Sequence, residues 1–229
     1  MNQKRMVIVT AIVLALVLTL ALVGYFYITR HSSRTYEEKV AAFTKENPSL
    51  FKGQIVFIGD SITEHYPLDR HYRSLDLKVY NRGISGDTVS WMKMRLGESL
   101  FALSPSKVVL MIGTNDINYG KSTEEIAIEY ESVLQMMQKS LPDASIFCVS
   151  IIPQNTEYSP DANLANRRIL EINEKIKALV ASYGMTYVDL YASLVDEDGL
   201  LARRYSSDGL HLNARGYRIW TDVMKDLLA

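Results

Sequence analysis

Short apolar runs recur along the chain from residue 55 onward, and each ends in a turn-forming or small polar residue. Runs rich in Val and Ile that show no polar alternation are typical of strands buried on both faces of a sheet. The five predicted strands are Ile55–Ile58, Lys78–Tyr80, Val108–Ile112, Ser145–Ile151 and Thr186–Asp189.

Between the strands, apolar residues recur at intervals of three and four, which predicts amphipathic helices. The predicted helices cover residues 36–45, residues 88–96, a segment opened by the capping-box spacing of Ser122 and Glu125, residues 165–183 with Gly184 at the C-cap, and residues 214–229 with Asn213 as N-cap. Strands that alternate with helices imply right-handed crossovers and a parallel sheet. We therefore expect an α/β fold, a three-layer α/β/α sandwich over residues 51–229.

The amino-terminal region has a different pattern. Residues 6–28 carry no charge and follow Lys4 and Arg5. A helix of this length would measure about 34 Å, enough to cross the hydrocarbon core of a bilayer. We expect residues 1–5 to be a short cytoplasmic tail, 6–28 a transmembrane signal anchor and 29–50 a connector. A cleaved signal peptide is the alternative, although its apolar region is normally shorter and ends in a small-x-small site.

This anchor predicts a single-pass protein of the cell membrane. Arg30 and Arg34 follow the apolar segment as closely as Lys4 and Arg5 precede it, so charge bias alone does not decide the orientation. The shortness of the amino-terminal tail favours an extracytoplasmic position for the domain.

Composition narrows the function classes. Of 229 residues, 48% are hydrophobic and 22% charged, as expected for a globular domain with a full core. The 25 basic and 26 acidic residues nearly cancel, and no basic stripe is interleaved with aromatics, which argues against a nucleic-acid partner. Cys148 is the single cysteine, so it forms no disulfide within the chain, and its apolar neighbours predict a buried structural thiol.

Candidate chemistry stands where the predicted strands end. Gly59-Asp60-Ser61-Ile62 follows the first strand and places a serine hydroxyl at the carboxyl edge, where open α/β sheets bind ligands. Asn115 follows the third strand, and its amide can donate a hydrogen bond to developing negative charge, whereas the carboxylate of Asp116 cannot. Residues 81–88 add backbone N–H groups at a loop-to-helix junction. Each segment alone is also consistent with an ordinary turn.

A serine nucleophile also needs a base and a group that orients the base. Of the four histidines, His31 lies in the connector, and His65 and His71 lie in a polar loop segment that favours a solvated surface role. His211 follows Asp208 by three residues, so the carboxylate can reach the imidazole across one turn. A bystander histidine in an Asp-Gly turn is the alternative. The histidines lack the close pairing of a zinc site, so we expect no metal.

Four segments together resemble the four blocks of the SGNH (GDSL) hydrolases, in the family's order: Gly59-Asp60-Ser61, Ser85-Gly86-Asp87-Thr88, Gly113-Thr114-Asn115-Asp116 and Asp208-Gly209-Leu210-His211. The resemblance implies a flavodoxin-like, mostly parallel five-stranded sheet and no cofactor. It implies Ser61 as nucleophile, His211 as base and Asp208 as the acid that orients the base. The oxyanion hole would use the N–H groups of Ser61 and Gly86 and the side chain of Asn115. Gly83 is the competing glycine, which we interpret as a turn residue.

The resemblance implies a serine esterase that works through an acyl-enzyme. Members of the family hydrolyse lipid esters, thioesters and acetyl esters of carbohydrates. The compact layout favours a short acyl group, such as acetyl on a cell-envelope or extracellular carbohydrate. The alternatives are a lysophospholipase or thioesterase acting on lipid esters, and a non-catalytic, membrane-tethered glycan-binding module. Side chains between the first two strands either line an acyl pocket or pack in the core, which we favour: Tyr66, Leu68, Tyr72 and Leu75.

Overall fold

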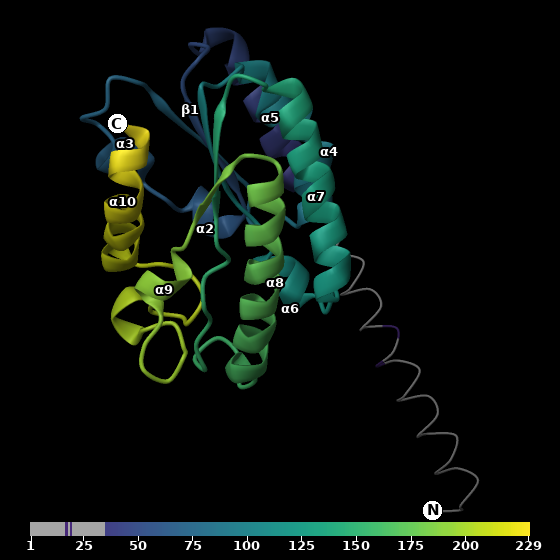
Figure 1. Ribbon diagram of the computed structural model, residues 1–229, viewed down its shortest axis with the longest axis vertical. Helices are drawn as coiled ribbons and strands as arrows, with labels where there is room; N and C mark the ends of the chain where they lie inside the picture. The colour runs from purple at the N-terminus through teal and green to yellow at the C-terminus, as the bar shows by residue number, and fades with distance from the viewer. Residues whose placement is uncertain (1–16, 18, 20–34) are drawn as a thin grey trace, which may run out of the picture. The chain divides into compact units, whose positions relative to one another are not determined.

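All five strands of the sheet run parallel, in the order β2-β1-β3-β4-β5 (Figure 1). The computed structural model describes residues 17, 19 and 35–229. The strands are β1 Ile55–Gly59, β2 Val79–Gly83, β3 Lys107–Met111, β4 Ser145–Val149 and β5 Thr186–Val188. The predicted α/β fold with a parallel five-stranded sheet is therefore confirmed.

One strand was predicted too short. β2 continues to Gly83, which pairs with Gly59 of β1, whereas the sequence pattern ended at Tyr80. The additional residues include Asn81 and Arg82, whose polar side chains interrupt the apolar pattern from which the strand was predicted. Arg82 is nevertheless buried, and its guanidinium binds Glu46 at 3.0 Å and Asn47 Oδ1 at 3.2 Å.

The helices agree with the periodicity, with one exception. The predicted helix over residues 88–96 is broken at Arg95 into α4 and α5. The helical elements are η1 Asn47–Ser49, α2 Ser61–Glu64, α3 Leu68–His71, α4 Val89–Met94, α5 Leu96–Ser99, η2 Phe101–Leu103, α6 Thr114–Asn118, α7 Thr123–Ser140, α8 Ala162–Ser182, α9 Tyr191–Leu194, η3 Arg203–Tyr205 and α10 Ala214–Leu228. Residues 35–46 are also helical.

The predicted caps form as their residue types require. Ser122 and Glu125 make the reciprocal capping box at the start of α7. Asn213 opens α10 by accepting hydrogen bonds from the N–H groups of Arg215 and Gly216. Gly184, with a φ of 68°, ends the long helix α8 in the left-handed region, which glycine adopts without steric cost.

Helices cover both faces of the sheet within residues 43–229 (Figure 1). Helices α4, α5, α7 and α8 pack on one face, and α2, α3, α9 and α10 pack on the other. On the second face Tyr66, Tyr72 and Trp220 surround Phe57, with ring centroids 5.4 to 6.1 Å from the Phe57 ring.

The core interpretation of the side chains between β1 and β2 is confirmed. Tyr66, Leu68 and Tyr72 are buried, and Leu75 packs against the same core. Leu68, Tyr72 and Leu75 also border a hollow of about 290 Å³ near the start of β2. This hollow lies at the amino edge of the sheet, whereas Ser61 lies at the carboxyl edge.

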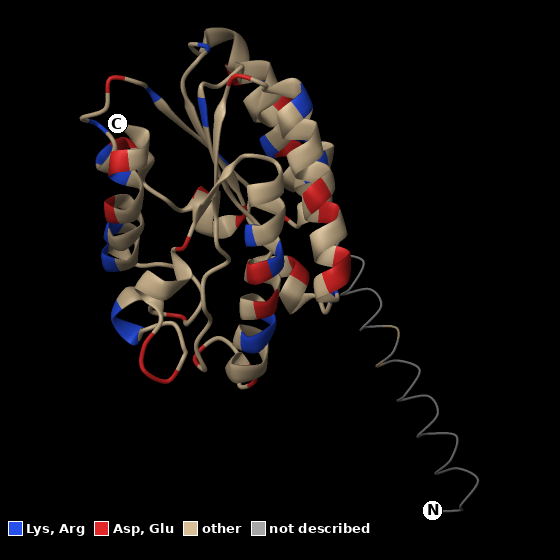
Figure 2. Cartoon of the chain, in the orientation of Figure 1, with Lys and Arg blue, Asp and Glu red and all other residues tan. Residues whose placement is uncertain are grey.

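Charged side chains of both signs are interspersed over α7, α8 and α10 (Figure 2). Cys148 is buried in β4, and burial raises the pKa of its thiol to about 12. It is therefore an inert core residue, as predicted.

The predicted tail at residues 1–5 and the predicted anchor at 6–28 lie outside the described residues, apart from Val17 and Thr19. In the part of the chain that the structure describes, no helix combines the length and apolarity needed to cross a membrane.

Candidate active site

Ser61 is the first residue of α2, directly after β1 ends. Asp60 caps the helix by accepting a hydrogen bond from the Ile62 N–H at 2.9 Å. Gly59 permits the close turn, because a Cβ there would lie 2.0 Å from the Met111 carbonyl oxygen of β3. The sequence therefore holds the serine at the carboxyl edge of the sheet through local geometry.

Ser61, His211 and Asp208 form a continuous hydrogen-bonded array. Ser61 Oγ lies 2.9 Å from His211 Nε2, and His211 Nδ1 lies 2.7 Å from Asp208 Oδ2. The structure thus brings Ser61 together with His211, which lies 150 residues further along the chain, and with the nearby Asp208. This is the arrangement in which a histidine accepts a proton from serine while a carboxylate fixes its tautomer.

The segment from Ser206 to His211, here called the Asp208 turn, is held by the second oxygen of Asp208. Asp208 Oδ1 accepts hydrogen bonds from the N–H groups of His211 at 2.8 Å and Leu210 at 3.0 Å. Partial burial opposes ionisation, but the hydrogen bonds from the His211 ring and these two N–H groups hold the pKa of Asp208 well below its usual range. Asp208 is therefore ionised at neutral pH and suited to orient His211.

The structure distinguishes the two glycines of the second block. The interpretation of Gly83 as a turn residue was wrong, because Gly83 is the last residue of β2 and pairs with Gly59 of β1. A Cβ on Gly83 would lie 2.2 Å from the backbone nitrogen of Glu64, so this glycine allows β2 to pack against α2. Gly86 has a φ of 80°, and the nearest atom to a Cβ there is the Tyr119 hydroxyl at 4.0 Å. Gly86 thus borders open space, where a substrate can approach the backbone.

The loop that carries Gly86 is anchored to the helix that carries Ser61. The backbone N–H and the hydroxyl of Ser85 both donate to Glu64 Oε2, each at 2.6 Å. Sequence reasoning missed this contact. Glu64 and Ser85 stand 21 residues apart, and no local pattern links them.

Asn115 lies in α6, just after β3, and is half-buried. Its Nδ2 donates to the Asp87 carbonyl oxygen at 2.8 Å. An amide nitrogen carries two hydrogens, so this bond orients the side chain and leaves one donor for a ligand.

Beneath these loops lies a buried carboxylate cluster of Asp60, Asp87 and Asp116. Arg95 binds Asp87 at 2.7 Å and also donates to the carbonyl oxygens of Arg82 and Gly59. Burial raises the pKa of Asp60 to about 7, and it raises that of Asp87 to about 6 despite Arg95. The pKa of Asp116 is likewise raised by burial, although Lys121 lies 2.9 Å away. The three aspartates stand in separate motifs of the sequence, and no local pattern predicts that they are buried together.

The other histidines are placed differently. The His65 ring lies 5.3 Å from the His211 ring, centroid to centroid. His71 Nδ1 is 2.7 Å from Thr221 Oγ1 on α10, and burial and the nearby Arg70 and Arg218 lower the pKa of His71. His31 lies outside the described residues. Among the described histidines, the hydrogen bond to Ser61 Oγ is made by His211.

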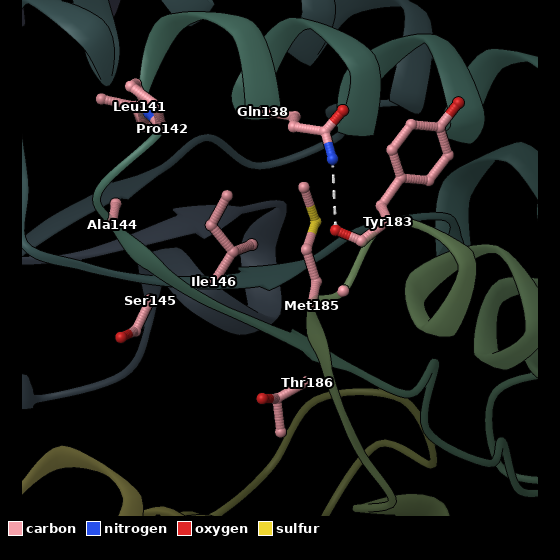
Figure 3. A pocket seen from close by; sticks show the side chains of 10 residues that line it. Gln138, Leu141, Pro142, Ala144, Ser145, Ile146, Tyr183, Met185 and Thr186 are labelled. Carbon is pink, nitrogen blue, oxygen red and sulfur yellow. Dashed lines mark hydrogen bonds between the residues drawn. The ribbon is translucent and has the colours of Figure 1, made fainter.

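A pocket of about 310 Å³ lies at the opposite edge of the sheet, by the amino ends of β4 and β5 (Figure 3). It is lined by Gln138 near the end of α7 and by the segments that lead from α7 into β4 and from α8 into β5. Gln138 donates to the Tyr183 carbonyl oxygen. The pocket is therefore separate from the site at Ser61. Within residues 35–229, no cluster of His, Cys, Asp or Glu is placed to hold a metal ion.

Known proteins resemble this chain in sequence and in fold. The model of the GDSL-like lipase/acylhydrolase family matches residues 57–219. The chain is 28% identical over 168 residues to platelet-activating factor acetylhydrolase IB subunit alpha2 of Homo sapiens, covering 71% of this chain and 70% of that protein. It is 28% identical over 131 residues to an acetylxylan esterase of Geobacillus stearothermophilus, covering 53% and 58%. A solved structure from Streptococcus pneumonia, named after platelet activating factor, superposes with a TM-score of 0.84 at 29% identity, covering 91% of this chain and 99% of that one.

Proposed function

The chain belongs to the GDSL-like lipase/acylhydrolase family, and we propose that it is a serine esterase with Ser61, His211 and Asp208 as its catalytic triad. The observation that carries the proposal is the unbroken array from Ser61 Oγ through His211 to Asp208. A non-catalytic glycan-binding module on this scaffold would not need a serine, a histidine and an aspartate joined by hydrogen bonds in this order.

In the proposed mechanism, Ser61 Oγ attacks the carbonyl carbon of an ester while His211 Nε2 takes its proton. The ionised Asp208 stabilises the imidazolium that forms. The imidazolium then gives its proton to the departing alcohol, leaving the acyl group on Ser61. Water attacks the acyl-enzyme with His211 again as base, which releases the carboxylic acid and restores the serine.

The developing oxyanion would be stabilised by the N–H groups of Ser61 and Gly86 and by Asn115 Nδ2. Support comes from the open space beside Gly86 and from the free hydrogen on the oriented amide of Asn115. One such donor typically contributes about 100-fold to 1000-fold to the rate. This chemistry needs neither a metal nor a cofactor.

For the substrate, we propose an ester of a short acyl group, acetyl above all, on a cell-envelope or extracellular carbohydrate. The names of two relatives, an acetylhydrolase and an acetylxylan esterase, support the acetyl group. Tyr66, Leu68 and Tyr72 are buried in the core, so these side chains are not available to line a pocket for a long acyl chain. The apolar segment 6–28 supports a single-pass membrane protein whose hydrolase domain faces the extracytoplasmic side.

The test uses the detergent-solubilised full chain and a serine-directed fluorophosphonate probe. We expect labelling and hydrolysis of nitrophenyl acetate in the wild type, and loss of both in Ser61→Ala. Ser74→Ala, at an exposed serine in the segment between α3 and β2, is the matched control and should retain both. Full activity of a folded Ser61→Ala protein would show that the nucleophile is wrongly assigned.

An acyl series from acetyl to octanoyl nitrophenyl esters tests the substrate. We expect kcat/KM to fall as the chain lengthens. A preference for octanoyl would instead support the lysophospholipase or thioesterase alternative.

A further inference from the structure

Two exposed tyrosines flank the candidate active site, and the proposed mechanism uses neither. Tyr119 lies just after α6, where its N–H donates to the Asn115 carbonyl oxygen at 2.8 Å. Residues four apart on a helix share one face, so Tyr119 follows Asn115 by one turn. Its side chain is 66% exposed, and its hydroxyl lies 4.0 Å from the position of a Cβ on Gly86. Tyr119 therefore borders the proposed oxyanion donors.

Tyr158 lies beside the Asp208 turn. Its N–H donates to the Asn155 carbonyl oxygen, and the Asn155 N–H donates to the Gly209 carbonyl oxygen at 2.8 Å. The Tyr158 nitrogen is 2.7 Å from the position of a Cβ on Gly209, so the backbone of Tyr158 packs directly on the turn that holds Asp208 and His211. The side chain of Tyr158 is 43% exposed.

Consecutive hydrogen bonds through Asn118 of α6 hold the Tyr158 ring in place. Asn118 Nδ2 lies 3.2 Å from the Tyr158 hydroxyl, and Asn118 Oδ1 accepts from Gln154 Nε2 at 2.8 Å. Gln154 is fully buried. Burial raises the pKa of Tyr158, and the proximity of Tyr119 and Asp208 adds to that shift. The two tyrosines thus border one site, with Gly86 and Asn115 beside Tyr119 and the Asp208 turn beside Tyr158.

We propose that Tyr119 and Tyr158 form a subsite for the alcohol part of the substrate and that this alcohol is a sugar ring. The inference rests on the proposed esterase function and names the group that the esterase recognises. A pyranose has an apolar C–H face and a rim of hydroxyl groups. A tyrosine ring offers a flat face of negative potential and a polar tip, so it matches both parts. A long alkyl chain would instead favour an enclosed apolar groove.

The position of the subsite is consistent with the chemistry. An ester held with its carbonyl oxygen near Gly86 and Asn115 must direct its alcohol away from the Ser61 Oγ that attacks it. His211 must reach the same alcohol oxygen to protonate it. Because Tyr158 packs against the turn carrying His211, its ring is suited to hold the leaving alcohol within reach of that histidine.

The experiment compares three acetates that differ only in the alcohol: a monoacetylated methyl glucopyranoside, ethyl acetate and hexyl acetate. In the full-length protein, Tyr119→Ala and Tyr158→Ala should each raise KM for the sugar ester roughly fivefold to tenfold. Ethyl acetate should show little change in either variant, since it lacks a ring to stack. Tyr119→Phe should retain most of the affinity, because it keeps the aromatic face.

Phe51→Ala is the matched control. Phe51 is 70% exposed but precedes the amino end of β1, at the opposite edge of the sheet. It should leave the kinetics of all three acetates unchanged.

Equal losses for the three acetates in Tyr119→Ala would overturn the subsite, as would a loss for hexyl acetate as large as that for the sugar ester. If the wild type hydrolyses no ester, the proposed function fails by itself. The subsite is then judged by an NMR titration with methyl glucopyranoside: binding that Tyr119→Ala weakens would support it, and no binding to the wild type would overturn it.

Discussion

The Asp208 turn and the buried carboxylate cluster both place aspartates at the carboxyl edge of the sheet, but in opposite electrostatic environments. Asp208 in the turn is 53% exposed and receives hydrogen bonds from the His211 ring and two backbone N–H groups, which lower its pKa. Asp60 in the cluster is 1% exposed, and burial raises its pKa to about 7. Among the described residues, Asp60 Oδ2 has no hydrogen-bond partner.

The difference shows how one residue type supplies two properties at one site. Donors aimed at Asp208 stabilise its charge, so it can orient His211 and stabilise an imidazolium. The cluster instead fixes the loops that carry Ser61, Gly86 and Asn115. We therefore expect changes in the turn to alter the rate with little effect on folding, and changes in the cluster to alter stability first.

The largest expected effect is that of Asp208→Asn on the rate. Asn Oδ1 can still accept the N–H groups of Leu210 and His211, which preserves the turn. Its amide would face His211 Nδ1 with a donor and favour the wrong tautomer. We expect kcat to fall about 10⁴-fold, with an unchanged urea midpoint. The measurements are nitrophenyl acetate kinetics and urea unfolding followed by circular dichroism.

Asp198→Asn serves as the control for this change, since Asp198 is an exposed aspartate of the loop before η3. It should keep both the rate and the urea midpoint. A large loss of stability in Asp208→Asn would contradict the expectation, because changes in the turn would then affect folding as changes in the buried carboxylate cluster do.

Next in size is the loss of stability on replacing Arg95, which binds Asp87 of the cluster. Arg95→Met leaves Asp87 without its cation and two carbonyl oxygens without their donor. Breaking a buried ion pair in this way typically destabilises a fold by about 3 to 5 kcal/mol. We expect a decrease of that order in the free energy of unfolding, measured by urea titration.

Arg95→Met combined with Asp87→Asn should recover part of the loss, since the isolated charge is then gone. Lys175→Met provides the surface control, because the Lys175–Glu124 pair is exposed and should matter little. If the double variant were no more stable than Arg95→Met, the unpaired charge would not be the cause.

The same contrast explains which features the sequence could predict. β1 and β3 form continuous apolar runs, and Ser61, Asn115 and His211 stand in short motifs at element ends, so local patterns located them. The end of β2 was missed because Asn81 and Arg82 are polar, and their pairing and burial depend on distant residues. The Arg95–Asp87 pair was missed because an arginine in a helical pattern normally faces solvent. The close packing of Gly83 against Glu64 could not be predicted, because only the folded chain brings these two residues together.

The smallest expected effect is a change in the pH dependence of stability in Asp60→Asn. The pKa of Asp60 is raised in the folded state from 3.8 to about 7, so the folded protein binds more protons than the unfolded chain between these values. Stability therefore falls as pH rises through this window. Asn caps a helix as well as Asp does and carries no charge, so the variant lacks this penalty.

At pH 5 Asp60 is still protonated in the folded protein but already ionised in the unfolded chain, so part of the penalty is present. Between pH 5 and pH 8 we expect the stability of Asp60→Asn relative to the wild type to increase by about 2 to 3 kcal/mol. Urea titrations of both proteins at each pH measure this gap, and the difference cancels the opposite pH dependence of His71. Asp143→Asn, at an exposed turn before β4, should show no such gap. A gap that stayed constant from pH 5 to 8 would mean that Asp60 is already ionised in the folded protein at pH 5, and the contrast with Asp208 would be lost.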